Sequence, residues 1–443
     1  MQKNSTFFQL PIFVLIVISC VTTNKPNTSQ FPDFGYMVDP ENYHGRIFKL
    51  SQNYPNNLPE KDPGVEAILN IDFKKDWKAY ALLVRDYILE GNMGSTYENS
   101  FYLEDNKIRD WFHVPWQHWG PGGREGIHGL TQEGPLSELS LAPEQTIASH
   151  AYAVGFYNSP GGYTIGKLWP NTFAPDLDWF KAGNGFPEGT VVGKLLFAPY
   201  TEKMVPYLKD PVQWNAYIVS SDIPGNTKSG REIAPVRLLQ MDIMVRDPRA
   251  NNDTGWVFGT FVYNGALKNK NRWKNLMPVG LMWGNDPENK LSKTNPKPQK
   301  TIINTNLKQT AINKSPKMPP MHLGWNSRLN GPADNPASSC MSCHSTAQYP
   351  MASAIMPFLN QPPVSIPAEG SQADKAWMKW FRNVPCTEPF DKGEATSLDY
   401  SLQMADSVQN FAEYINQTQK GYFYEQYWEK GHKVFRNVFS GKK

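Results

Sequence analysis

The sequence predicts an α+β protein in which a large antiparallel β-sandwich or jelly-roll-like body precedes a smaller, mainly helical domain. Three observations support this prediction. The 37 Pro and 33 Gly together make up about one residue in six of the 443, above the usual share of about 12 %, which favours short strands and turns. Strand patterns dominate residues 61–288. After residue 344 apolar residues recur at helical spacing.

The first 20 residues are predicted to be a lipoprotein signal peptide. Lys3 precedes an almost wholly apolar run at residues 7–18, which is too short to span a bilayer. Residues 17–20 (VISC) resemble the bacterial lipobox, in which Cys20 would become the lipid-modified N-terminus. Because Val21 follows instead of Asp, we expect the periplasmic side of the outer membrane in a Gram-negative cell. The alternative is an ordinary cleaved signal with an incidental cysteine.

Residues 21–60, rich in Thr, Asn and Pro, are predicted to be a polar tether. The β-rich domain is expected to follow at residues 61–288. Its clearest strand is 239–246, where the odd-numbered residues are apolar and most even-numbered ones polar, the period of a half-buried strand. Residues 251–255 (NNDTG) predict a turn and 256–263 a second strand, which would complete a hairpin.

Two further predictions concern the same body: a strand at residues 190–197, and a tight turn at 158–163, where two glycines follow Pro160. Residues 289–320 change to Lys, Asn, Thr and Pro and predict a linker or surface excursion. The last, smaller domain is expected at residues 321–443.

Two helices are predicted in that last domain. The longer one has an apolar stripe at i, i+4, i+7 and i+11 and would start at Asp399 or Ser401. The stripe consists of Met404, Val408, Phe411 and Ile415. A shorter amphipathic helix is expected around residues 376–381.

Residues 340–344 (CMSCH) predict the covalent attachment of one haem c. In a C-x-x-C-H motif the two thiolates add to the two vinyl groups of a haem, and the adjacent imidazole ligates its iron. Cys340, Cys343 and His344 are therefore the predicted haem-binding residues, with His344 as the metal ligand. The alternatives are a disulfide, a thioredoxin-like redox pair or half a zinc site. No βαβ pattern surrounds the motif, and Cys386 has no second cysteine to form a zinc pair.

Residues 322–332 (HLGWNSRLNGP) and 335–340 (NPASSC) resemble a group of bacterial exported c-type cytochrome family proteins. The segments that also fit this resemblance are 123–129, 279–286, 381–386 and 398–402. The resemblance covers most of the chain after residue 100. It implies haem binding and electron transfer but no substrate, and only the two cysteines and the histidine of the motif match haem-ligating roles.

The sixth position on the iron decides between a carrier and a catalyst. Two strong protein ligands favour outer-sphere electron transfer, whereas an open position admits a small ligand. The candidates are Met404, Met356, Met351, His322 and Cys386, or an open position. Met404 also belongs to the helix stripe, so a core role is favoured. For Cys386 we favour burial over iron ligation, an intermolecular disulfide or a reactive thiol.

A second cluster lies within residues 111–128, which contain three Trp, three His, Arg124 and Glu125. These residues could line a sugar or small-molecule pocket, or place a histidine above the haem. The alternative is an aromatic core with surface histidines. The sequence shows no catalytic triad, phosphate-binding glycine loop or metal-binding triad.

Three function classes follow. The leading one is an exported monohaem c-type cytochrome, anchored by lipid, that transfers electrons with an unidentified redox partner protein. The alternatives are a haem oxidoreductase or peroxidase acting on a small substrate, and a β-sandwich binding protein, for example for carbohydrate, with an accessory haem. The net charge of +3 implies no nucleic-acid partner.

Overall fold

The computed structural model describes residues 36–39, 41–93, 100–117, 123–170, 174–289, 298–309, 323–352 and 370–418. The predicted signal peptide with Cys20 lies outside the described residues, and so do His322 and Met356. No helix in these ranges is long and apolar enough to cross a membrane.

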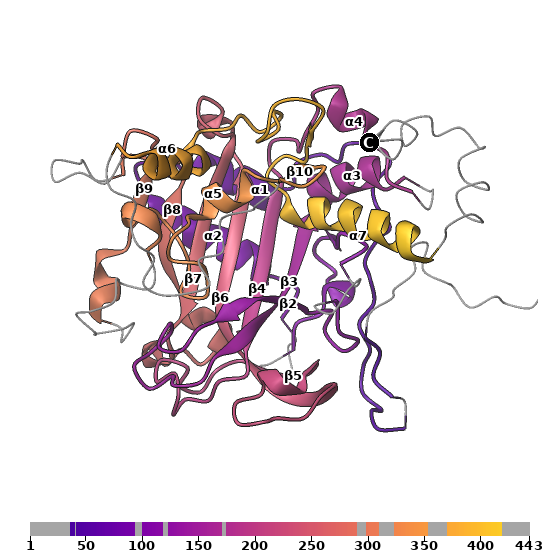
Figure 1. Cartoon of the computed structure of the whole chain (residues 1–443), viewed down its shortest axis with the longest axis vertical. Coiled ribbons are helices and arrows are strands. Elements are labelled where there is room, and N and C mark those ends of the chain that lie inside the picture. Colours follow the sequence, from indigo (N-terminus) through magenta and orange to yellow (C-terminus); the bar gives the residue numbers. More distant parts are fainter. Residues whose placement is uncertain are drawn as a thin grey trace, which may run out of the picture.

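The centre of the described molecule is a nine-stranded antiparallel sheet with the order β1-β3-β4-β6-β7-β8-β9 (Figure 1). β2 pairs with β3, and β5 pairs with β6. The strands are β1 (Trp111–Phe112), β2 (Thr131–Leu136), β3 (Ser149–Asn158), β4 (Val191–Ala198), β5 (Gln213–Val219), β6 (Arg231–Arg246), β7 (Trp256–Tyr263), β8 (Leu276–Met282) and β9 (Thr301–Ile303). A separate short pair joins β10 (Gln348–Tyr349) to β11 (Thr396–Ser397).

Helices cover both faces of this sheet. They are α1 (Pro63–Asn70), α2 (Trp77–Leu89), α3 (Ser159–Leu168), α4 (Asp178–Lys181), α5 (Cys340–His344), α6 (Gln372–Met378) and α7 (Leu402–Thr418). Figure 1 shows α7 in front of the strands and α2 behind them. A Cβ at Gly193 would lie 3.2 Å from Ile88 of α2, whereas one at Gly155 would collide with Gln403 of α7. Gly155 pairs with Lys194, the neighbour of Gly193, and successive strand residues face opposite sides.

The α+β class and the large antiparallel body are confirmed, but the described residues form one main sheet and not two facing ones. In the described part of the chain, helices and connecting segments cover the sheet where a second facing sheet was expected. All eight residues of β7 are consequently buried. A cytochrome c-like helical domain is not confirmed, because Met404, Val408 and Phe411 of α7 belong to the same core cluster as the strands.

Several local predictions are confirmed. β6 and β7 form the hairpin expected from residues 239–263, with turn residues between them. β4 matches the strand predicted at 190–197 within one residue. α7 contains the whole predicted apolar stripe, and Ser401 Oγ accepts a hydrogen bond from the Met404 backbone N–H (3.2 Å) at its start.

The tight turn predicted at residues 158–163 is wrong, because these residues begin helix α3. Asn158 is its N-cap, accepting a hydrogen bond from the Gly161 N–H (3.5 Å), and Pro160 lies in the first turn. A polar residue followed by proline is typical of helix starts as well as turns. Gly162 is needed for packing, because a Cβ there would collide with the Phe112 ring.

Two predicted boundaries also differ from the structure. The second half of the predicted tether packs on the body: Ser51 Oγ donates to the Trp111 carbonyl (2.6 Å), and Tyr54 Oη donates to the His113 carbonyl (2.7 Å). The predicted linker contains β9, which pairs with β8. Polar composition does not exclude a short strand at the edge of a sheet.

Candidate functional site

The C-x-x-C-H motif forms the single-turn helix α5, whose start is fixed on both sides. Ser339 Oγ accepts from the Ser342 N–H (3.1 Å), and Ser342 Oγ accepts from the Ser339 N–H (2.7 Å), a reciprocal capping box. Ser339 Oγ also donates to Asn285 Oδ1 (3.0 Å), and the Cys340 N–H donates to the Leu329 carbonyl (3.1 Å). These bonds hold the motif at one position on the body.

The three side chains with predicted haem-binding roles differ in burial from the residues between the cysteines. Cys340, Cys343 and His344 are partly exposed, whereas Met341 and Ser342 are fully buried. Cys340 packs against the main core and Cys343 against a second, aromatic cluster. Both thiols of the motif are free.

Burial changes the acidity of the motif thiols. It raises the pKa of Cys343 to about 11. Burial also raises the pKa of Cys340 well above its usual value, and the nearby charges of Asp334 and Asp242 add to this effect. Redox-active C-x-x-C pairs depend on a lowered thiol pKa. The direction of these shifts favours haem attachment over the redox-pair interpretation.

His344 is held in the state that a metal ligand requires. Its Nδ1 lies 2.9 Å from the Tyr400 carbonyl oxygen, and its ring lies 5.0 Å from the Phe258 ring. Burial lowers the pKa of His344 to about 4, so the imidazole is neutral at physiological pH. A carbonyl can only accept, so the proton belongs on Nδ1 and the lone pair on Nε2. Nε2 is then available to bind iron.

A row of polar side chains lies on the sheet face beneath α5. Lys194, Asp242 and Thr260 are cross-strand neighbours on β4, β6 and β7. Gln240 Nε2 donates to Asp242 Oδ1 (2.9 Å) and to Asp334 Oδ2 (3.1 Å). Burial raises the pKa of both carboxyl groups. Sequence reasoning missed this row; its only signal was the polar even-numbered positions of the strand at 239–246.

An aromatic cluster packs on the other side of the motif, against Cys343. The Trp325 and Trp377 rings lie 5.4 Å apart and are 6 % and 7 % exposed. Their indole Nε1 atoms are buried and have no hydrogen-bond partner in the described part of the chain. The cluster consists of Trp325, Ala337, Trp377, Trp380, Phe381, Val384 and Phe390. Trp111 Nε1, far from the motif, is buried without a described partner in the same way.

The candidates for the sixth ligand differ in burial and in the residues that they contact. Met404 is fully buried in the main core, where its place in the helix stripe puts it. Cys386 packs against the same core, and its Sγ lies 3.1 Å from Arg246 Nη2, which donates to it. Met351 is half-buried. His322 and Met356 cannot be placed, because they lie outside the described residues.

The second cluster predicted from the sequence divides into core and pocket. Trp111, Trp116, Arg124 and Glu125 are buried, and the Glu125 carboxylate accepts bonds from backbone N–H groups. His118 and Trp119 lie outside the described residues. The aromatic-core alternative therefore fits most of this cluster.

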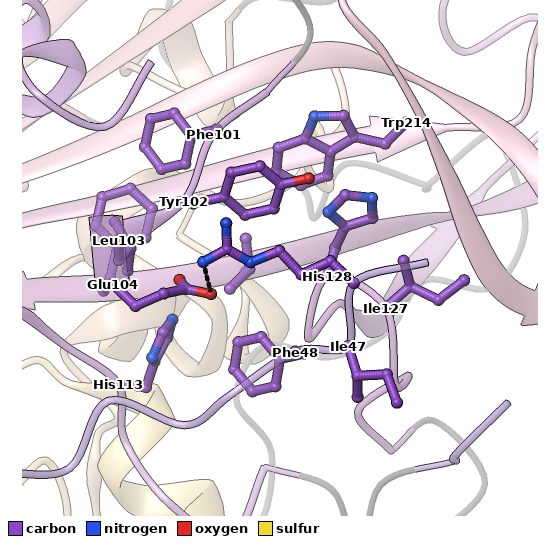
Figure 2. Close-up of a pocket in the computed structure, with 13 residues that line it drawn as sticks. Ile47, Phe48, Phe101, Tyr102, Leu103, Glu104, His113, Ile127, His128 and Trp214 are labelled. Carbon is purple, nitrogen blue, oxygen red and sulfur yellow. Dashed lines mark ion pairs between the residues drawn. The ribbon is translucent and has the colours of Figure 1, made fainter. Parts of the chain in front are cut away.

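His113 and His128 instead line a pocket on the face opposite α5 (Figure 2). The empty space between its lining residues, together with the adjoining solvent, is about 400 Å³. His128 stacks on Trp214 with ring centroids 4.3 Å apart. Arg46 at the pocket is already paired with Glu104 (2.7 Å). With its cation neutralised, the pocket offers no strong charge for a ligand.

Within the described ranges, no group of three or more His, Cys, Asp or Glu side chains is arranged to hold a metal ion. No family model, no curated protein and no solved structure matches the chain. The functional interpretation therefore depends on the geometry around α5.

Proposed function

We propose that the protein is an exported monohaem c-type cytochrome that transfers electrons to or from a redox partner protein. The observation that carries the proposal is the geometry of α5. Two free, partly exposed thiols and a neutral histidine lie on one capped turn, and a backbone carbonyl holds the histidine proton on Nδ1. This is the donor set that covalent haem attachment requires.

The surroundings fit a haem. Cys340 and Cys343 would hold the porphyrin through thioether bonds, and His344 would ligate the iron through Nε2. The aromatic cluster that packs against Cys343 would give the porphyrin an apolar, water-excluding neighbour. When bound, the haem supplies a one-electron couple between ferric and ferrous iron. The protein residues exclude water and orient the imidazole.

Export and lipid attachment at Cys20 belong to the same proposal. Haem attachment needs reduced thiols outside the cytoplasm, and a lipid anchor would keep the protein on the periplasmic side of the outer membrane. The support for both is the N-terminal sequence alone.

A haem oxidoreductase acting on a small substrate is the second candidate, favoured by Lys194 and Glu133, whose charges act on both His344 and Asp406. Burial raises the pKa of Asp406 on α7 to about 7, near the value at which a group exchanges protons best under physiological conditions. Lys194 forms an ion pair with Glu133 (3.0 Å), and the positive charge of Lys194 contributes to lowering the pKa of His344. Such groups could move protons during a reaction at an open sixth position.

Absorption spectra of the oxidised and reduced protein, with and without cyanide, separate the two candidates. An electron carrier gives a six-coordinate low-spin spectrum that cyanide changes slowly or not at all, and it does not turn over peroxide. A spectrum that is high-spin, or that cyanide shifts at once, would favour the oxidoreductase.

A further inference from the structure

The Asp399–Tyr400 backbone has an unusual conformation next to the motif. Asp399 has a φ of 49° and Tyr400 a φ of 64°, so two successive residues with side chains adopt the left-handed region. This region carries a steric cost for such residues and is normally occupied by glycine. Positions of this kind persist only where the surrounding structure fixes them, and they cluster at functional sites.

The turn is closed by the Ser401 N–H, which donates to the Leu398 carbonyl (3.0 Å), and side-chain bonds anchor both of its central residues. The Asp399 carboxylate is 1 % exposed and accepts from Trp256 Nε1 on β7 (2.7 Å) and from the Phe186 N–H (2.5 Å). A Cβ at Gly185 would collide with the same carboxylate, so Asp399 fills the space against that backbone. Tyr400 Oη donates to the Val384 carbonyl (2.6 Å).

The consequence of this conformation lies in the backbone. The Tyr400 carbonyl oxygen is directed at His344 Nδ1, 2.9 Å away. The bond to His344 comes from the backbone of Tyr400, because the Tyr400 side chain donates to the Val384 carbonyl instead. The orientation of the His344 ring therefore depends on the Asp399–Tyr400 turn.

We propose that Asp399 is a positioning residue for the haem site: through Trp256 and Phe186 it fixes the turn whose Tyr400 carbonyl orients His344. This inference rests on the proposed function. A hydrogen bond from Nδ1–H to a carbonyl makes the imidazole a more basic ligand, which stabilises ferric over ferrous iron. Loosening the turn weakens that bond and raises the reduction potential.

Three variants of the lipidated, haem-loaded protein test this. Asp399→Asn tolerates the left-handed conformation but can satisfy only one of the two donors. Asp399→Ala satisfies neither donor, and Trp256→Phe removes one donor. The matched control is Trp111→Phe, because Trp111 is an equally buried core indole on β1 whose Nε1 has no partner in the described residues.

The readout is the midpoint potential from a spectroscopic redox titration. We expect Asp399→Ala to raise the reduced-to-oxidised ratio at a fixed potential about tenfold, the lower end of second-shell effects at metal sites. For one electron this is about 59 mV. Asp399→Asn and Trp256→Phe should raise the midpoint potential by less, and Trp111→Phe should leave the midpoint potential unchanged.

Equal potentials in all four variants and the unmodified protein would overturn the positioning role while leaving haem binding intact. If Asp399→Ala does not fold, the comparison of Asp399→Asn with Trp111→Phe decides alone. Absence of covalent haem in the unmodified protein would instead refute the proposed function.

Discussion

Arg328 gives the sharpest test of how the body holds the C-x-x-C-H motif. Its guanidinium is fully buried and donates to four backbone carbonyls: Asn285 (2.7 Å), Asp286 (2.7 Å), Asn289 (2.9 Å) and Trp325 (3.2 Å). These bonds join the segment after β8 to the segment that precedes α5. The next residue, Leu329, accepts the Cys340 N–H through its carbonyl.

Arg328→Met would leave the Asn285 carbonyl without a donor. The carbonyls of Asp286, Asn289 and Trp325 would each lose one of two donors, because they also accept from the Asn289 N–H, Asn326 Nδ2 and the Arg328 backbone N–H. We therefore expect the free energy of unfolding to fall by about 2–4 kcal/mol, from one orphaned buried carbonyl and the loss of charged hydrogen bonds to the other three. Arg328→Lys should lose less, because an ammonium keeps the charge but cannot span four acceptors.

Equilibrium urea unfolding measures these changes, with the denaturant slope checked for constancy. The control is Arg237→Met, since Arg237 is partly exposed and donates to a single carbonyl, that of Tyr200 (3.1 Å). It should lose about 1 kcal/mol. The reasoning would be refuted if Arg328→Met cost no more than Arg237→Met.

Three further predictions concern ligands and pH. Met404→Leu should cost less than about 1.5 kcal/mol, as a volume-conserving core change, and should leave the ferric spectrum unchanged; a shifted spectrum would make Met404 the sixth ligand. Cys386→Ser should leave the Soret and charge-transfer bands unchanged, and a shift of either band would show thiolate ligation. Burial against Trp214 lowers the pKa of His128 from 6.5 to about 4, so the unfolded state binds this proton first and stability falls as the pH falls from about 6.5 to about 4. In urea unfolding, His128→Phe should reduce the loss of unfolding free energy between pH 6.5 and pH 4 by about 1–3 kcal/mol, the lower figure allowing for partial exposure of the ring. An unchanged pH dependence would contradict the lowered pKa of His128.

The features predicted correctly are those that local patterns determine. The hairpin of β6 and β7 follows from alternation and a turn within 25 residues, and the stripe of α7 lies within a single helix. The haem assignment of residues 340–344 also depends on a local pattern, the spacing of two cysteines and a histidine, and it stays a prediction.

The features that were missed depend on distant parts of the chain. His344 takes its orienting bond from Tyr400, 56 residues away, and the acceptor is a backbone carbonyl that no residue type encodes. The strand at 239–246 was predicted to be half-buried, with its polar face outside the core. Gln240 on that face is fully buried, because the segment that contains Asp334 covers it. The start of α3 was missed because Asn158 and Pro160 favour a turn and a helix start equally.

The intact mass of the exported protein tests the central claim most directly. The chain is produced in a host that attaches haem c, extracted with acid and acetone to remove non-covalent haem, and compared with a Cys340→Ala/Cys343→Ala variant. If Cys340 and Cys343 attach haem, the unmodified chain will retain the mass of one haem, and the variant will retain none. An unmodified chain that carries no haem, with both motif thiols reacting as free thiols, would contradict it.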